Sequence, residues 1–251
     1  MTRRRWIADE FSLTPAGAQS ASAGNPRADR AALTGAHAAH LARTLRARVG
    51  QQFEVACGDK VRRGTIASVA NDRVEFTLGE EVPAQTVVPI TLLLAVFKFD
   101  RMEWAIEKCT ELGVSRIVPV IARRTDAHLA AAAPNRAERW RRLARQAAEQ
   151  SRRTLPPEIS SPVKIKDAVQ TPAEMRILLA EHEQQVSLAD ALAFHPPGQP
   201  VALAIGPEGG WTHDEVTAFT AAGWIAATLG PTILRAETAA IAALAVAQSA
   251  L

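Results

Sequence analysis

The chain has 251 residues, of which 47% are hydrophobic, and a formal net charge of +3. This is enough apolar material for a buried core, in one large domain or two ordinary ones. The only cysteines, Cys57 and Cys109, form no close-spaced pair, which excludes a disulfide framework and a cysteine-based metal site. The basic N-terminus lacks the apolar segment of a signal peptide, and the longest apolar runs are too short to cross a bilayer. We therefore expect a cytoplasmic protein with no membrane segment and no metal.

Basic residues are concentrated in two parts of the chain. Residues 1–75 carry twelve Lys or Arg against seven Asp or Glu, and residues 136–153 carry seven Arg against two Glu. Local basic areas of this kind indicate a polyanionic partner such as nucleic acid. A solvated surface that simply favours arginine explains the charge equally well.

Short alternating apolar segments dominate the first 80 residues. Strands are predicted around residues 53–55, 61–69 and 74–78, with turns at Gly58-Asp59 and Asn71-Asp72 between them. A compact β-barrel is the expected result. It is interrupted by one predicted helix over residues 35–48 and by a small, polar loop over residues 17–30.

Strands and helices alternate after a connecting segment at residues 81–89. The predicted strands cover residues 90–96, 116–121, 176–180, 201–205 and 225–229. The predicted helices cover residues 101–112, 136–151, 187–194, 214–222 and 236–250. This alternation predicts an α/β domain with a parallel sheet between helices, in which ligands bind at the carboxyl ends of the strands.

The last predicted helix is apolar on all sides, because no polar residue occurs from Ala239 to Ala247. A helix of this kind is buried all round. An interface with a second copy of the chain would bury it, and so would a position in the core of a single chain.

A glycine-rich turn, Gly206-Pro207-Glu208-Gly209-Gly210, follows the predicted strand at residues 201–205. Thr212 and Glu215 then have the spacing of a capping box, which predicts a helix start directly after the turn. The glycines do not have the spacing of either common nucleotide-binding loop, and no phosphate-binding lysine is present. The turn suits a neutral or cationic ligand that contacts the backbone, although a purely structural bend is an equal explanation.

A second Gly-Pro turn follows the next strand, in the segment LGPTILRAETAA at residues 229–240. It leads through Arg235 and Glu237 into the apolar helix. Glu237 has a simple structural explanation, since an acidic side chain complements a helix N-terminus. Two Gly-Pro turns at consecutive strand ends favour one shared pocket over two unrelated bends.

The two turns together, GPEGG and then LGPTILRAETA, resemble the SPOUT class of methyltransferases. Within that class the chain resembles the bacterial family that methylates N3 of uridine in 16S ribosomal RNA of the small subunit. The resemblance extends to HLARTLRARVG at residues 40–50, RMEWAIEKCTELGVSRIVPV at residues 101–120 and RLARQAAEQSRRTLPPEI at residues 142–159. It therefore covers nearly the whole chain.

The resemblance implies a fold, a cofactor and partners. Residues 1–80 would form a PUA-like RNA-binding β-barrel, residues 81–89 a linker, and residues 90–251 a SPOUT domain whose parallel sheet contains a trefoil knot. The cofactor would be S-adenosylmethionine, the substrate 16S ribosomal RNA, and the active form a homodimer through the knot and the C-terminal helix.

The resemblance also assigns roles to single residues. Arg235 would stabilise the uracil anion, and Glu237 would orient Arg235, receive the proton or only hold the loop. Arg43, Arg46 and Arg153 would bind RNA. The cofactor would contact Leu179, Glu181, Ile205, Gly206, Pro207, Gly209, Gly210, Leu229, Gly230, Ile233, Leu234 and Thr238.

Four positions depart from the family pattern. This chain has Arg123 where the family has Glu, Arg152 where it has Gly, Thr232 where it has Arg, and Ala236 where it has Thr. Two other functions stay open. One is a SPOUT enzyme that methylates a ribose 2′-oxygen or another base. The other is a non-catalytic RNA-binding assembly factor.

Overall fold

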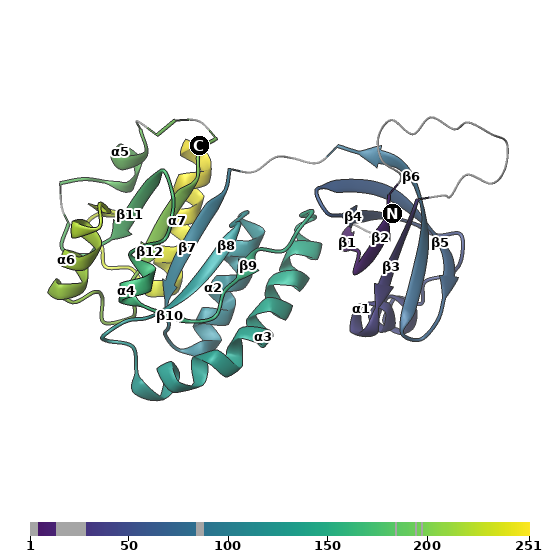
Figure 1. Ribbon diagram of the computed structural model, residues 1–251, viewed down its shortest axis with the longest axis horizontal. Coiled ribbons are helices and arrows are strands. Elements are labelled where there is room, and N and C mark those ends of the chain that lie inside the picture. Colours follow the sequence, from purple (N-terminus) through teal and green to yellow (C-terminus); the bar gives the residue numbers. More distant parts are fainter. Residues whose placement is uncertain (1–4, 14–28, 84–87, 184, 194, 197) are drawn as a thin grey trace. The chain divides into compact units, whose positions relative to one another are not determined.

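The computed structural model describes residues 5–13, 29–83, 88–183, 185–193, 195–196 and 198–251. The chain forms two compact units, drawn with their elements in Figure 1. One consists of Met1–Gln85 with Ala148–Leu155, and the other of Thr86–Ala147 with Pro156–Leu251. Residues 17–28 of the expected loop lie outside the described residues. Residues 84–87 of the expected linker lie outside them too.

A six-stranded sheet forms the N-terminal unit. Its order is β1 (Arg5–Ile7), β4 (Gln52–Cys57), β5 (Lys60–Val69), β6 (Arg73–Val82), β3 (Arg30–Thr34) and β2 (Glu10–Ser12). β1 and β4 are parallel, and the other pairs are antiparallel. Alternate side chains of the strands, among them Trp6, Leu33 and Phe76, are buried in one core. The strands predicted from residues 53–78 and the two turns between them are confirmed.

The predicted helix at residues 35–48 is shorter than expected. It consists of α1 (Gly35–Ala39), which continues into the π-helical turn η1 (His40–Thr44). Arg46 has φ of 51°, in the left-handed region that a helix does not continue through. Arg43 and Arg46 are both exposed on this short helix and the turn after it.

A parallel sheet forms the centre of the C-terminal unit, as the alternation of elements predicted. Its order is β10 (Val163–Lys164), β8 (Arg116–Ile121), β7 (Ile90–Ala95), β12 (Val201–Ile205), β11 (Met175–Leu179) and β13 (Ile225–Ala227), with β9 (Glu158–Ile159) also paired to β8. Both faces are buried because successive strand residues, such as Leu92 and Leu93, enter two different cores.

Helices cover both faces of this sheet. The core on one face includes side chains of α2 (Phe99–Glu111), α3 (Ala127–Gln150), α5 (Leu188–Leu192) and α7 (Ala236–Ala250). The core on the other face includes side chains of α4 (Ile165–Ala168) and α6 (His213–Ala221). No helix in the described part of the chain is long and apolar enough to cross a membrane.

The largest difference from the predicted helices is at α3, which begins at Ala127 and not at Arg136. Pro134 lies inside the helix and removes one of its internal hydrogen bonds. The helix continues through it because Ala133, Ala137 and Trp140 are all buried against the sheet. Packing therefore outweighs the local preference of proline.

Candidate functional site

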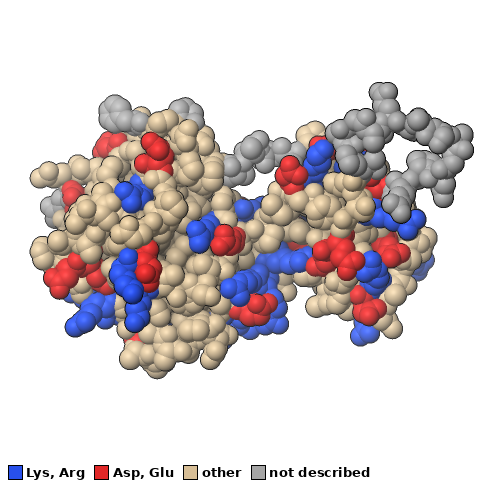
Figure 2. All heavy atoms as spheres, viewed as in Figure 1, with Lys and Arg blue, Asp and Glu red and all other residues tan. Residues whose placement is uncertain are grey.

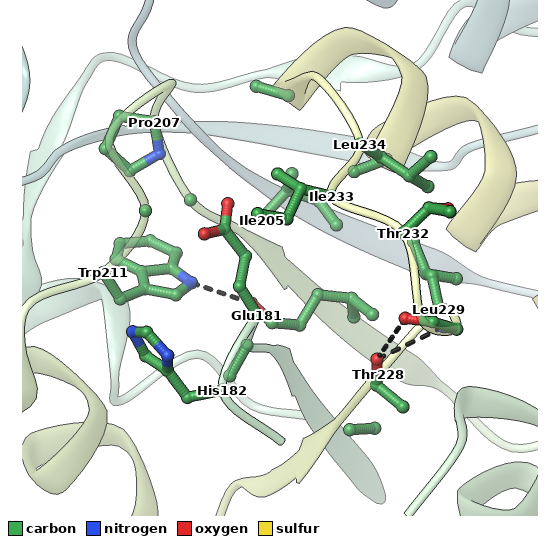
Figure 3. Close-up of a pocket in the computed structure, with 18 of the residues that line it drawn as sticks. Glu181, His182, Ile205, Pro207, Trp211, Thr228, Leu229, Thr232, Ile233 and Leu234 are labelled. Atoms are coloured by element: carbon green, nitrogen blue, oxygen red, sulfur yellow. Dashed lines mark hydrogen bonds between the residues drawn. The ribbon is translucent and has the colours of Figure 1, made fainter. Parts of the chain in front are cut away.

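A pocket lies at the carboxyl ends of three neighbouring strands, β12, β11 and β13 (Figure 3). The segments that line it are residues 179–182, 205–211 and 227–236, which each follow one of these strands. It encloses about 830 Å³, measured out to its open mouth. Ligand sites of α/β sheets occupy this position, and the two Gly-Pro turns share it as expected.

Most of the residues predicted to bind the cofactor come together in this pocket. Leu179, Glu181, Ile205, Gly206, Pro207, Gly210, Leu229, Gly230, Ile233 and Leu234 all line it. Gly209 and Thr238 do not line it. The α-carbon of Gly209 faces the aliphatic part of Arg124, and Thr238 is exposed on α7.

The glycines of the first turn are needed for two different reasons. Gly210 has φ of 69°, a left-handed conformation that other residues adopt only with strain. A Cβ on Gly206 would lie 3.3 Å from Nε1 of Trp211, which leaves little room for a side chain. The turn is thus shaped by its own neighbours as well as by space for a ligand.

The capping box predicted at Thr212 and Glu215 is present at the start of α6. Glu215 is buried, and its Oε2 accepts hydrogen bonds from the backbone N–H and the hydroxyl of Thr212. Its Oε1 accepts a third bond, at 2.7 Å, from the backbone N–H of Arg123. One carboxylate therefore holds the glycine turn and the loop after β8 together.

Several residues of the pocket were not predicted to bind the cofactor, among them Arg124, His182, Trp211 and Thr228. Trp211 is buried and donates from Nε1 to the carbonyl of Leu179 at 3.1 Å. The Arg124 guanidinium donates to the carbonyls of Gly209 and Trp211. Arg124 follows β8, so the rule that parallel strands bind ligands at their carboxyl ends was the signal that would have found it.

Arg235 and Glu237 have different surroundings, although they are two residues apart. Arg235 is the exposed N-cap residue of α7, and no described residue forms an ion pair or hydrogen bond with its side chain. Glu237 is only 6% exposed, and its Oε1 lies 3.8 Å from Nε of Arg101. Arg101 also pairs with Glu208 of the glycine turn, at 2.6 Å. The cation beside Glu237 is therefore Arg101, and no ion pair or hydrogen bond joins Glu237 to Arg235 in the described part of the chain.

Basic and acidic side chains are interspersed on the face of each unit shown in Figure 2. Arg153 is half-buried, and burial lowers its pKa to about 10, so it keeps its charge at neutral pH.

Arg152, where the family pattern has Gly, has φ of 62°. The departure therefore falls at a left-handed position that favours glycine. Of the other departures, Thr232 and Ala236 line the pocket, and the backbone of Arg123 is bound by Glu215.

Comparison with known proteins identifies the family to which this parallel sheet and its pocket belong. A family model for an RNA methyltransferase domain matches residues 84–248, so this unit is an RNA methyltransferase domain. The ribosomal RNA small subunit methyltransferase E of Synechocystis sp. is 33% identical over 85% of this chain and 71% of its own. That of Bacillus subtilis is 30% identical over 84% of this chain and 87% of its own. The chain belongs to the ribosomal RNA small subunit methyltransferase E family.

A solved structure is also similar over nearly the whole chain. It is the ribosomal RNA small subunit methyltransferase E from Neisseria gonorrhoeae bound to S-adenosylmethionine. The two share 28% identity with a TM-score of 0.81, over 98% of this chain and 97% of the other.

Proposed function

We propose that this protein transfers a methyl group from S-adenosylmethionine to N3 of a uridine in 16S ribosomal RNA of the small subunit. The observation that carries the proposal is that the segments at residues 179–182, 205–211 and 227–236 line one shared pocket. A relative similar over nearly the whole chain is bound to S-adenosylmethionine. The choice of N3 comes from the family that the two Gly-Pro turns resemble.

The residues of the pocket fit S-adenosylmethionine. Ile205, Leu229, Ile233 and Leu234 give it apolar walls for an adenine ring. Ile233 is 81% exposed, the highest value among the exposed large hydrophobic residues described, so a ligand in the pocket would cover it. Gly206 and Gly230 bring backbone close to the ligand space.

The reaction depends more on the positioning of N3 against the methyl group than on a strong base. When bound, S-adenosylmethionine supplies a methyl carbon on a positively charged sulfur, and the carbon–sulfur bond breaks with its electron pair left on sulfur as N3 bonds to carbon. N3 must also lose its proton, and it must leave its base pair to reach the pocket. Holding N3 in line with the methyl group is then the main task of the protein.

Arg235 is the proposed catalytic residue. Its guanidinium is exposed and lacks a partner among the described residues, so it is available to a substrate. It would stabilise the uracil anion by donating to the carbonyl oxygens beside N3. Protons released from N3 would pass to solvent.

Glu237 is proposed as a positioning residue. Its buried carboxylate lies beside Arg101, which in turn holds Glu208 in the glycine turn. The start of α7 and the turn after β12 are thereby connected through one guanidinium. In this arrangement Glu237 is not required to accept the proton that leaves N3.

RNA binding is proposed for the N-terminal unit, which we infer to be a PUA-like barrel. Arg43 and Arg46 project from the short helix and the turn after it, and Arg153 belongs to the same unit. If these cations bind phosphates, RNA affinity will fall steeply as the salt concentration rises. Removal of Arg43 would lower the slope of log affinity against log salt concentration by about one unit.

A trefoil knot and a homodimer complete the proposal. α7 buries Ala240, Ala243 and Ala247 against its own chain, whereas Thr238 and Ala245 are exposed. The exposed stripe is small and nearly apolar, which suits close packing against a second copy. The knot would be formed by the same three loops that line the pocket.

Incubation of small ribosomal subunits with S-adenosylmethionine carrying a labelled methyl group tests the function. The subunits would come from a strain that lacks the enzyme, and the RNA would be digested to nucleosides. We expect N3-methyluridine. A 2′-O-methylated or differently methylated nucleoside would identify another SPOUT activity, and a lack of label would point to a non-catalytic assembly factor.

A further inference from the structure

The carboxylate of Glu181 extends into the centre of the pocket. Figure 3 shows it directed between Pro207 and Ile233, away from the backbone of its own loop. A Cβ built on Gly210 would lie 3.4 Å from Oε2 of Glu181, so the carboxylate lies directly over the bare glycine. No described residue forms an ion pair or hydrogen bond with Glu181.

The other titratable side chains that line the pocket leave this charge uncompensated. Arg124 directs its guanidinium to the carbonyls of Gly209 and Trp211. His182 is exposed, and Figure 3 shows its ring beside Trp211. The remaining pocket residues are apolar, glycine, proline, threonine or buried tryptophan. The pocket therefore offers one free negative charge to its ligand.

We propose that Glu181 makes the pocket selective for the positively charged methyl donor over the neutral product, S-adenosylhomocysteine. This inference rests on the proposed function, since it concerns the ligand of the same site. The two molecules differ by the methyl group and by the positive charge on sulfur. A carboxylate attracts that charge and gains nothing from the neutral thioether. Glu181 thus favours binding of the donor before transfer and release of the product after it.

A neutral contact would behave differently. If Glu181 only accepted hydrogen bonds from the ribose hydroxyls, donor and product would bind equally well to that group, because both carry the same ribose. The ratio of the two affinities therefore separates attraction to charge from a neutral contact.

The test is isothermal titration calorimetry of the full-length protein with three ligands. They are S-adenosylmethionine, S-adenosylhomocysteine and sinefungin, in which a protonated amine stands beside the position of the sulfur. We expect the wild type to bind both cationic ligands more tightly than the neutral product. In Glu181→Gln we expect the preference to shrink by about fivefold, the size of a partly exposed ion pair. Glu181→Asp, which keeps the charge, should retain part of the preference.

Glu174→Gln is the matched control. Glu174 is an exposed acid just before β11, whereas Glu181 follows the other end of the same strand. It does not line the pocket, so its removal should leave all three affinities unchanged. A weakening in Glu181→Gln that is equal for the three ligands, or no change at all, would overturn the inference and leave the proposed function standing. If the wild type binds none of the three ligands, both the inference about Glu181 and the proposed function are overturned.

Discussion

The indole Nε1 of Trp211 donates a hydrogen bond to the main-chain carbonyl of Leu179 at 3.1 Å. This bond connects the loop that follows β12 to the last residue of β11, and both segments line the pocket. The ring is 5% exposed, lies against Gly206 and packs on Phe219 with ring centroids 5.2 Å apart. Trp211 therefore sets the distance between two walls of the pocket.

Replacement of Trp211 by Phe should weaken cofactor binding without unfolding the protein. A smaller aromatic ring replaces the indole, and the carbonyl of Leu179 loses a buried donor at a cost of about 1–3 kcal/mol. Because the two loops are then held less firmly, we expect the affinity for S-adenosylmethionine to fall by about five- to tenfold. Calorimetric titration measures the affinity, and thermal unfolding measures the stability.

Trp224→Phe is the control for this variant. Trp224 is also buried, packs on Phe219 with ring centroids 5.0 Å apart, and donates from Nε1 to the carbonyl of Val169 at 3.0 Å. It does not line the pocket. The two variants should lose similar stability, and only Trp211→Phe should lose affinity. An equal loss of affinity in both would show that Trp211 acts through general stability alone.

Gly210→Val should abolish cofactor binding in a protein that still folds. The new side chain would have to adopt the left-handed conformation at φ of 69° and would enter the space beside Glu181. The backbone strain costs about 1–2 kcal/mol, which a domain of this size tolerates. Circular dichroism checks the fold, and calorimetry checks the binding.

Gly198→Val separates strain from the loss of pocket space. Gly198 has a similar φ of 79°, and no described atom lies within 4 Å of where its Cβ would be. We expect a comparable loss of stability with normal cofactor affinity. Binding that persists in Gly210→Val would contradict the role of the glycine turn in the pocket.

The sequence predicted the strands and helices that frame the pocket, because their periodicity is local. Val201–Ile205, Arg116–Ile121 and Ala236–Ala250 have the predicted bounds. The Thr212–Glu215 box follows from a pattern that spans only a few residues, and it is present at the start of α6. Most of the residues that the family resemblance assigned to the cofactor also line the pocket.

Contacts between distant segments were not predictable in the same way. Trp211 donates to Leu179, and Arg101 pairs with both Glu208 and Glu237, but no periodicity connects these positions. They depend on which strands are neighbours in the sheet, which a single sequence does not state. For the same reason the sequence left open whether Glu237 orients Arg235, receives the proton or only holds the loop.

The ion pair between Arg152 and Glu54 should make stability depend on pH. Hydrogen bonds from Arg152, and then from Arg5, hold the pKa of Glu54 below its usual value of 4.5, against the opposite effect of burial. A lowered folded-state pKa means that the pair stabilises the fold fully above the unfolded pKa. This contribution is lost as the pH falls from about 4.5 through the folded-state pKa. The stability difference between wild type and Arg152→Gly, measured by denaturant unfolding, should therefore be largest at neutral pH and shrink in acid.

Arg152→Ala should be less stable than Arg152→Gly by about 1 kcal/mol, because only glycine adopts φ of 62° without strain. Both variants lose the ion pair with Glu54. Arg63→Ala serves as the comparison, since its partner Glu80 is well exposed and the pair contributes little. If Arg152→Gly and Arg152→Ala are equally stable, the left-handed backbone at this position does not strain the wild type.

Arg235→Ala should separate binding from catalysis. The side chain is exposed and does not line the pocket, so the affinity for S-adenosylmethionine should stay within about twofold of the wild type. Methyl transfer to small ribosomal subunits should slow by about 10²- to 10³-fold, the usual effect of removing one donor to a developing anion. Single-turnover assays with saturating cofactor measure the rate, and calorimetry measures the affinity. Arg235→Lys keeps the charge but not the paired donors, so it should recover only part of the rate. A wild-type rate in Arg235→Ala would exclude Arg235 from the reaction.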